Sequence, residues 1–146
     1  MSKRLSYRVE RHTTASPEAV FDVVADAPGW RTWAPLVSRS GWEDPARTRV
    51  GAVRLVGSAG VVAREQIEAW ERPGLLGYTI LGGGPARDYH AEVRCTRSTD
   101  GGTVVVWSGD YRPHGLFGRP YLLFLRWLMP RLTGAMVAEA ERRTTA

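Results

Sequence analysis

Residues 87–112 read RDYHAEVRCTRSTDGGTVVVWSGDYR, and they predict two long antiparallel strands joined by a turn at Asp100-Gly101-Gly102. Apolar and polar residues alternate on both sides of that turn, which is the period of a strand with one buried face. The small residues Ala91 and Gly109 share the apolar face with three aromatic rings, which are those of Tyr89, Trp107 and Tyr111. Small residues among aromatic side chains predict a pocket wall that carries polar groups, with an ordinary filled core as the alternative.

The length of the turn determines the register of this hairpin. A three-residue turn pairs Cys95 with Trp107 and gathers the apolar residues on one face. A two-residue turn would instead place Trp107 beside Glu92 and Arg94. We favour the three-residue turn, although it sets Glu92 opposite Asp110 on the outer face, where like charges destabilise a sheet.

The strand pattern extends along most of the chain. Apolar residues alternate with polar ones near the start, and later segments rich in Val, Ile, Tyr and Trp are separated by turns that contain Gly and Pro. Short turns between consecutive strands are typical of an antiparallel meander. We predict strands at Leu5–Thr13 and at 38–44, 50–56, 61–71, 75–82, 87–98 and 103–112.

Two short helices are predicted between the first and second strands. Ser16 can cap a helix in which Pro17 takes the first helical position, and this helix is expected to end just before Pro28. Residues 29–37 follow, with tryptophan and leucine side chains three positions apart, and they predict a second short helix.

A long helix is predicted over residues 119–143, with a kink at Pro130 because proline removes one backbone hydrogen bond. At 1.5 Å per residue, about 25 residues span roughly 37 Å, which is the width of a strongly curved sheet. The order of elements therefore predicts an α+β fold. A curved antiparallel sheet of seven strands would wrap around the long C-terminal helix, with two short helices after the first strand and a single domain over residues 1–146.

Helical periodicity predicts which side of the long helix faces the sheet. It places Phe124, Leu128 and Arg131 on the sheet side and Arg126 on the opposite side. Two interpretations of Arg131 remain open. Its guanidinium could lie in a cavity and hold a carboxylate, phenolate or enolate oxygen. The favoured alternative is that Pro130 shifts the helical phase and Arg131 reaches solvent.

Composition excludes several classes of protein and partner. The chain has 146 residues, of which 43% are hydrophobic and 24% charged, and these values are typical of a globular protein rather than a disordered or collagen-like one. The net charge is +5, but the basic residues are scattered, so we expect no specific nucleic-acid partner. No secretory or transmembrane segment is evident, which predicts a cytoplasmic protein.

The cysteine and histidine content argues against a metal site. The chain has one cysteine, Cys95, so it can form neither an internal disulfide nor a zinc site built from cysteines. His12, His90 and His114 do not have the spacing of metal ligands. We therefore expect neither a metal ion nor a cofactor.

The order of elements and several segments resemble the START-like (SRPBCC) helix-grip superfamily, in its polyketide cyclase/dehydrase branch. Besides the opening strand, the segments that carry the resemblance are SPEAVFDVVAD at 16–26, WRTWAPL at 30–36, IEAWERP at 67–73, Asp88-Tyr89, and GGTVVVW at 101–107. The resemblance implies an apolar or amphipathic small molecule bound between the sheet and the long helix. Members include aromatase/cyclases, hydrolyases, carriers and sensors, so the fold alone does not select a function.

The leading hypothesis is a protein that binds an apolar or aromatic small molecule, lipid- or polyketide-like, in a cavity between the sheet and the C-terminal helix. Burial of apolar surface would supply the affinity, and phenol and indole groups would orient the ligand. The expected lining residues are Trp33, Ile67, Tyr78, Tyr89, Trp107, Tyr111, Phe124 and Leu128. We expect the protein to be a monomer or a homodimer.

Two alternatives come from other functional classes. The first is a polyketide cyclase/dehydratase-type enzyme, in which positioning supplies much of the rate, Tyr89 or Tyr111 acts as acid or base, and Arg131 stabilises an enolate. His114, in the loop that rims the cavity mouth in this fold, is the best histidine for such chemistry. The second is an adaptor that binds RNA or protein through its basic surface, which salt-dependent binding would support.

Overall fold

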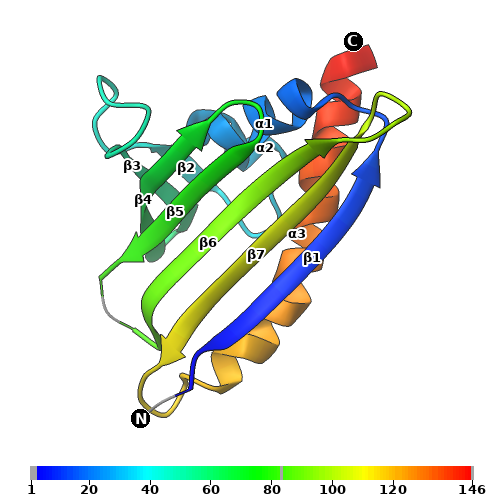
Figure 1. Ribbon diagram of the computed structural model, residues 1–146. Coiled ribbons are helices and arrows are strands. Elements are labelled where there is room, and N and C mark those ends of the chain that lie inside the picture. The colour runs from blue at the N-terminus through cyan, green and yellow to red at the C-terminus, as the bar shows by residue number, and fades with distance from the viewer. Residues whose placement is uncertain (1–2, 83, 146) are drawn as a thin grey trace.

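The structure is a computed structural model that describes residues 3–82 and 84–145, and there the chain forms one antiparallel sheet with helices on one side (Figure 1). The strands are β1 (Leu5–Thr13), β2 (Arg39–Trp42), β3 (Val53–Ser58), β4 (Val61–Glu71), β5 (Leu75–Leu81), β6 (Ala86–Arg97) and β7 (Thr103–Pro113). The helices are α1 (Pro17–Ala25), the 3-10 turn η1 (Ala27–Gly29), α2 (Trp30–Trp33) and α3 (Pro120–Thr145). The predicted α+β fold, with a seven-stranded sheet and a long C-terminal helix, is confirmed.

The strand order in the sheet is β1-β7-β6-β5-β4-β3-β2. Consecutive hairpins build this meander from β2 to β7, and β1 then pairs with β7 along its full length, from Leu5 opposite Tyr111 to Thr13 opposite Thr103. Figure 1 shows α3 lying along the inner side of the sheet, beside β1 and β7.

Polar contacts at both ends fix α3 to β1. Near the start of the strand, Arg126 donates a hydrogen bond to the carbonyl oxygen of Ser6 at 3.3 Å. At its end, the Thr13 hydroxyl donates to a carboxylate oxygen of Glu141 at 2.6 Å. The helix therefore follows one edge of the sheet, and the opposite part of the inner face is left for α1, α2 and a cavity.

The first short helix begins as its sequence predicts. The Ser16 side chain accepts a hydrogen bond from the backbone N–H of Ala19, and Pro17 takes the first helical position. The second predicted helix is shorter than expected, because residues 27–29 form a 3-10 turn and α2 ends at Trp33. Trp30 donates its indole N–H to the Val24 carbonyl oxygen at 3.0 Å. This hydrogen bond connects α2 to α1.

The register of the β6–β7 hairpin corrects the predicted turn. The structure pairs Val93 with Trp107, whereas the three-residue turn pairs Cys95 with Trp107. The turn comprises five residues, 98–102, and the Asp100 carboxylate closes it by accepting from the backbone N–H of Gly102. A shift of two residues keeps every side chain on its predicted face, because side chains alternate with a period of two. It also moves Glu92 away from Asp110, which removes the like-charge pair.

A β-bulge interrupts the pairing of β6 between Arg87 and His90. Asp88 lies at this bulge with a φ of 53°, a left-handed conformation that aspartate tolerates better than most residues. Its carboxylate accepts hydrogen bonds from Arg4, His90 and Arg112, so three side chains hold the bulge in place. The bulge positions the next residue, Tyr89, whose side chain is buried on the inner face.

The inner stripe of α3 differs in phase from the predicted one. Its buried residues are Leu125, Met129, Leu132, Thr133, Met136, Val137 and Ala140. Phe124 is exposed, and Arg131 lies on the solvent side, where its guanidinium carbon is 4.5 Å from the Trp127 ring centroid. The solvent-facing interpretation of Arg131 is therefore the correct one. The side chains of Leu123 and Trp127 are exposed as well.

Candidate functional site

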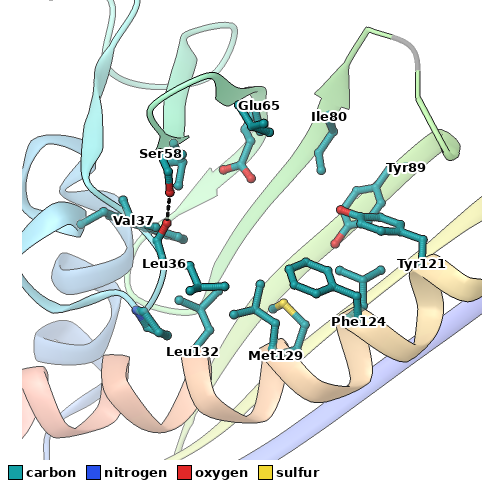
Figure 2. A pocket seen from close by; sticks show the side chains of 18 of the residues that line it. Leu36, Val37, Ser58, Glu65, Ile80, Tyr89, Tyr121, Phe124, Met129 and Leu132 are labelled. Carbon is teal, nitrogen blue, oxygen red and sulfur yellow. Dashed lines mark hydrogen bonds between the residues drawn. The ribbon is translucent and has the colours of Figure 1, made fainter. Parts of the chain in front are cut away.

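A cavity of about 290 Å³ lies between α3 and the sheet. Figure 2 shows side chains of α3 and of strands β4 to β6 facing one another across it. Its walls are mostly apolar, and the lining residues are Trp30, Pro35, Leu36, Val37, Val56, Gly57, Ser58, Val61, Ala63, Glu65, Tyr78, Ile80, Tyr89, Tyr121, Phe124, Leu125, Leu128, Met129 and Leu132.

The spacing of the lining residues follows from the two secondary structures. The helix contributes residues three or four apart, such as Leu125, Leu128 and Leu132, which lie on one face of α3. Strand β4 contributes alternate residues, Ala63 and Glu65, because side chains alternate across a sheet. Leu36, Val61 and Phe124 line the cavity and are also exposed, so they mark where it opens to solvent.

Half of the predicted ligand-binding residues line this cavity. Tyr78, Tyr89, Phe124 and Leu128 lie in its wall, and Trp33, Ile67, Trp107 and Tyr111 do not. Those four are buried in the surrounding core. Trp107 donates its indole N–H to the Tyr78 hydroxyl at 3.2 Å, and Tyr111 donates its hydroxyl to the Gly118 carbonyl oxygen at 2.7 Å. Trp107 therefore supports Tyr78, a residue of the wall, from behind.

The space predicted beside Ala91 and Gly109 is filled by Tyr7. A Cβ atom added to Gly109 would lie 2.5 Å from the Tyr7 hydroxyl oxygen and 2.7 Å from its ring. The side chain of Tyr7 is buried and hydrogen-bonds through its hydroxyl to that of Tyr89. The filled-core alternative is therefore correct for this part of the sheet, and the cavity lies farther toward β4 and β5.

Burial keeps the inner phenols protonated. It raises the pKa of Tyr7, Tyr78 and Tyr89 well above the ordinary value of a tyrosine, because the phenolate would lose its hydration. At neutral pH these groups are neutral hydroxyls, which can donate or accept hydrogen bonds but cannot serve as a ready base.

A buried ion pair that the sequence analysis did not single out lies against the cavity. Arg54 on β3 is fully buried and donates through Nε to Oε1 of Glu65 at 2.8 Å. Its Nη1 donates to the Val24 carbonyl oxygen, also at 2.8 Å. Its guanidinium carbon lies 4.4 Å from the ring centroid of Trp30 and 4.9 Å from that of Tyr78. Glu65 belongs to the cavity wall, and Arg54 stands behind it.

The alternation of β4 contained the signal for this pair. Glu65 has the same parity as Ile67, a predicted lining residue, so the alternation of β4 puts a carboxylate on the apolar face. Arg54 is directly opposite Glu65 in the β3–β4 hairpin. Opposite charges at inward positions of two consecutive strands indicate a buried pair.

The histidines lie away from the cavity. His114 is exposed and hydrogen-bonds to Arg87 at 3.0 Å, and His12 contacts Glu10. His90, on the outer face, lies between two carboxylates, and its hydrogen bond to that of Glu68 is the main cause that raises its pKa. Among residues 3–82 and 84–145 no three His, Cys, Asp or Glu side chains are grouped as metal ligands.

The thiol of Cys95 is buried, and burial raises its pKa to about 12. In the described part of the chain, no helix is long and apolar enough to span a membrane.

Comparison with known proteins places these features in a wider group. A family model described as polyketide cyclase / dehydrase and lipid transport matches residues 4–143. Uncharacterized proteins of Mycobacterium tuberculosis and Mycobacterium bovis are each 29% identical to this chain over 145 residues, covering 87% of this chain and 83% of the relative.

Solved structures share the fold. A putative uncharacterized protein of Bacillus thuringiensis aligns with a TM-score of 0.74 over 92% of this chain and 97% of its own, at 17% identity. The protein XoxI of Bacillus cereus aligns with a TM-score of 0.73 over 94% of each chain, at 18% identity. At these identities the likeness concerns the arrangement of the backbone alone.

Proposed function

The chain belongs to the polyketide cyclase / dehydrase and lipid transport family, and on this basis we propose that it binds an apolar or aromatic small molecule in the cavity between the sheet and α3. The observation that carries the proposal is the cavity itself, about 290 Å³ in volume and walled mostly by aliphatic and aromatic side chains. Small-molecule sites in proteins begin at about 300 Å³. The volume therefore favours a small lipid or a molecule with one or two rings.

Apolar burial would supply most of the binding energy. Each Å² of apolar ligand surface removed from water contributes about 25 cal/mol before the costs of association. Tyr78 and Tyr89 present phenol groups in the wall, and these can orient a ligand through hydrogen bonds or ring contacts. Trp30 also lies in the wall, so its fluorescence offers a direct signal of occupancy.

The test uses a neutral naphthylamine probe whose emission rises in apolar surroundings. Ala63→Phe adds a ring to the cavity wall and is expected to weaken probe binding at least about tenfold, because the ring occupies the ligand's volume. Val62→Phe adds the same ring to the neighbouring residue, which does not line the cavity, and serves as the matched control. Equal probe affinity in the two variants would show that the probe binds elsewhere and would overturn the proposal.

A cyclase or dehydratase is the second candidate, and one observation favours it: the Glu65 carboxylate lies in the wall of an apolar cavity. Such a carboxylate can accept a proton from a substrate carbon or hydroxyl. Of the residues predicted for this chemistry, Arg131 faces solvent and the Tyr111 hydroxyl donates to the Gly118 carbonyl oxygen. Tyr89 lies in the cavity wall, where burial raises its pKa and keeps it a neutral hydroxyl. Incubation with poly-β-ketone analogues distinguishes the two candidates. Turnover that is lost in Glu65→Gln while probe binding persists would favour the enzyme.

A further inference from the structure

Arg54 and Glu65 place two opposite charges in the interior of the protein. Taking two charges out of water is expensive, and a pair of apolar residues in their place is often equally stable. The position of the pair explains its presence better than stability does. Glu65 is the one charged residue among the described residues that line the cavity, so a ligand in the cavity meets its carboxylate.

Two of the three guanidinium nitrogens of Arg54 are engaged within the protein, and the third, Nη2, is buried without a hydrogen-bond partner among the described residues. Two of its nitrogens donate to Glu65 and to the Val24 carbonyl, and two aromatic rings lie against its guanidinium. Its side chain has no exposed surface and does not line the cavity. Its positive charge therefore balances that of Glu65 without being accessible to a ligand.

Glu65, in contrast, has acceptor capacity to spare. Among residues 3–82 and 84–145 its carboxylate has one hydrogen-bond partner, Arg54, which binds Oε1. Figure 2 shows the carboxylate pointing from β4 toward the interior of the cavity. A carboxylate can accept about four hydrogen bonds, so the oxygen on the cavity side is free to accept from a bound molecule.

We propose that Glu65 selects ligands with a hydroxyl group on an otherwise apolar body, an alcohol or a phenol, and rejects ligands that end in a carboxylate. The hydroxyl donates to the free oxygen of Glu65, and a hydrogen bond to a charged acceptor is stronger than one between neutral groups. A ligand carboxylate would face Glu65 at close range with no accessible cation to compensate it. A neutral donor suits the site better than an ammonium group, because Arg54 already balances the charge. This inference rests on the proposed function and names the class of its ligand.

Matched ligand pairs test the selection. Octanol is compared with octanoate, and para-propylphenol with para-propylbenzoate, by displacement of the naphthylamine probe near neutral pH. We expect the wild type to prefer each hydroxyl compound about tenfold or more. Glu65→Gln is expected to reduce that preference to near unity, because the neutral amide no longer repels a carboxylate. Glu68→Gln, on the exposed side of the same strand, is the control and keeps the wild-type preference.

Each outcome has a distinct meaning. Equal binding of the two members of each pair by the wild type, or a preference for the acids, overturns the inference but leaves the proposed function intact. Failure of every ligand and of the probe to bind overturns the proposed function itself. If Glu65→Gln does not fold, the double variant Arg54→Met/Glu65→Leu replaces the pair by apolar side chains. It must still bind the probe, and its preference for hydroxyl compounds must be smaller than that of the wild type, because only the loss of hydration then disfavours a carboxylate.

A second inference comes from an independent feature, an exposed apolar surface around the start of α3. Five large apolar side chains are solvent-exposed there, and we call them the α3 patch: Leu116, Phe117, Leu123, Phe124 and Trp127. Leu123 is 71% and Leu116 85% exposed. A concentration of such residues on one helix and its preceding loop is unusual for a surface that faces only water.

In the segment of the chain that carries the α3 patch, the charged side chains are all basic. Residues 111–138 contain no Asp or Glu, and they include Arg119, Arg126 and Arg131. None of the ion pairs among the described residues involves these three arginines, whereas most other arginines of the sheet are paired with carboxylates. Arg131 lies over the ring of Trp127, so charge and apolar surface are directly adjacent. Exposed aromatic and aliphatic groups with flanking arginines match the headgroup boundary of an anionic bilayer.

We infer that the α3 patch binds the surface of membranes that contain anionic lipids. Co-sedimentation with phosphatidylcholine vesicles, with and without phosphatidylglycerol, measures this. We expect binding that requires phosphatidylglycerol, weakens with salt, and falls at least about tenfold in Leu123→Gln/Trp127→Gln. Val50→Gln, an exposed valine outside the patch, is the control. No binding to either vesicle overturns the inference. If the protein instead dimerises and the double variant is monomeric, the patch is an interface between copies of the chain.

Discussion

Replacing Arg54 by methionine isolates the contribution of the buried ion pair. Arg54→Met keeps a flexible apolar side chain between Trp30 and Tyr78 but leaves Glu65, which is only 8% exposed, without its cation. Removing one partner of a buried pair costs about 3–5 kcal/mol, because the remaining charge is uncompensated. The Val24 carbonyl also loses its donor from Nη1. We expect a loss near the upper end of that range, a large part of the ~5–15 kcal/mol that holds a typical domain folded.

Urea denaturation followed by tryptophan fluorescence measures the change in free energy of unfolding. Arg64→Met removes an exposed pair with Glu43 on the other face of β4, and it serves as the control, with a far smaller loss expected. Arg54→Met/Glu65→Leu removes both charges and should recover most of the stability, within about 1–2 kcal/mol of the wild type. If Arg54→Met is no more destabilising than Arg64→Met, then Glu65 does not depend on Arg54 and the reasoning is wrong.

Three further predictions concern other parts of the sheet. Gly109→Ala is expected to destabilise the protein by about 1–3 kcal/mol in urea, because the added methyl group overlaps the ring of Tyr7. Hydrogen bonds, chiefly from Arg112, lower the pKa of Asp88 to about 2, so its contribution to stability is present near neutral pH and is lost as the pH falls through that value. Asp88→Asn should therefore lower the thermal midpoint near neutral pH and have no effect below pH about 2. The Cys95 thiol, with its pKa raised to about 12, should react with a disulfide reagent only after urea unfolds the protein.

Each of these predictions has a control or a result that contradicts it. Gly41→Ala adds the same methyl group where no atom lies within 4 Å, and it should change stability little. A difference between Asp88→Asn and the wild type that persists in strong acid would mean that the carboxylate stabilises the bulge by some route other than its ionised form. Rapid modification of Cys95 without denaturant would mean that the inner face of β6 opens readily.

The sequence predicted the elements well because local rules govern them. The Ser16 cap, the alternation of β1 and the ends of β4 follow from capping chemistry and a period of two, and neither depends on distant contacts. The order of the elements then limited the possible folds. The seven-stranded sheet and the long C-terminal helix could be predicted for that reason.

The register of the β6–β7 hairpin and the orientation of α3 about its axis depend on contacts between distant parts of the chain, which local sequence patterns do not reveal. A turn of five residues and a turn of three put the same side chains on the same face, so periodicity could not distinguish them. On α3, Leu123 and Trp127 are as apolar as the buried Leu125 and Met129, and hydropathy alone could not show which pair faces the sheet.

Half of the predicted lining residues belong to the cavity wall, and distant contacts again account for the rest. Tyr78 and Tyr89 belong to the wall, as predicted, but Tyr7 from the opposite end of the chain fills the place beside Gly109. Glu65 was not among the predicted residues. Its parity with Ile67 and its position opposite Arg54 contained the necessary information.

The pairing of β1 with β7 has a consequence for how the protein is made. Thr13 can pair with Thr103 only after Thr103 has been synthesised. Strand β1 therefore leaves the ribosome long before β7 exists. Its inward side chains, Tyr7 and Val9, must remain in solution during that interval, within reach of chaperones. Contacts so distant along the chain slow folding, and β1 is therefore expected to join the sheet only after the polypeptide is nearly complete.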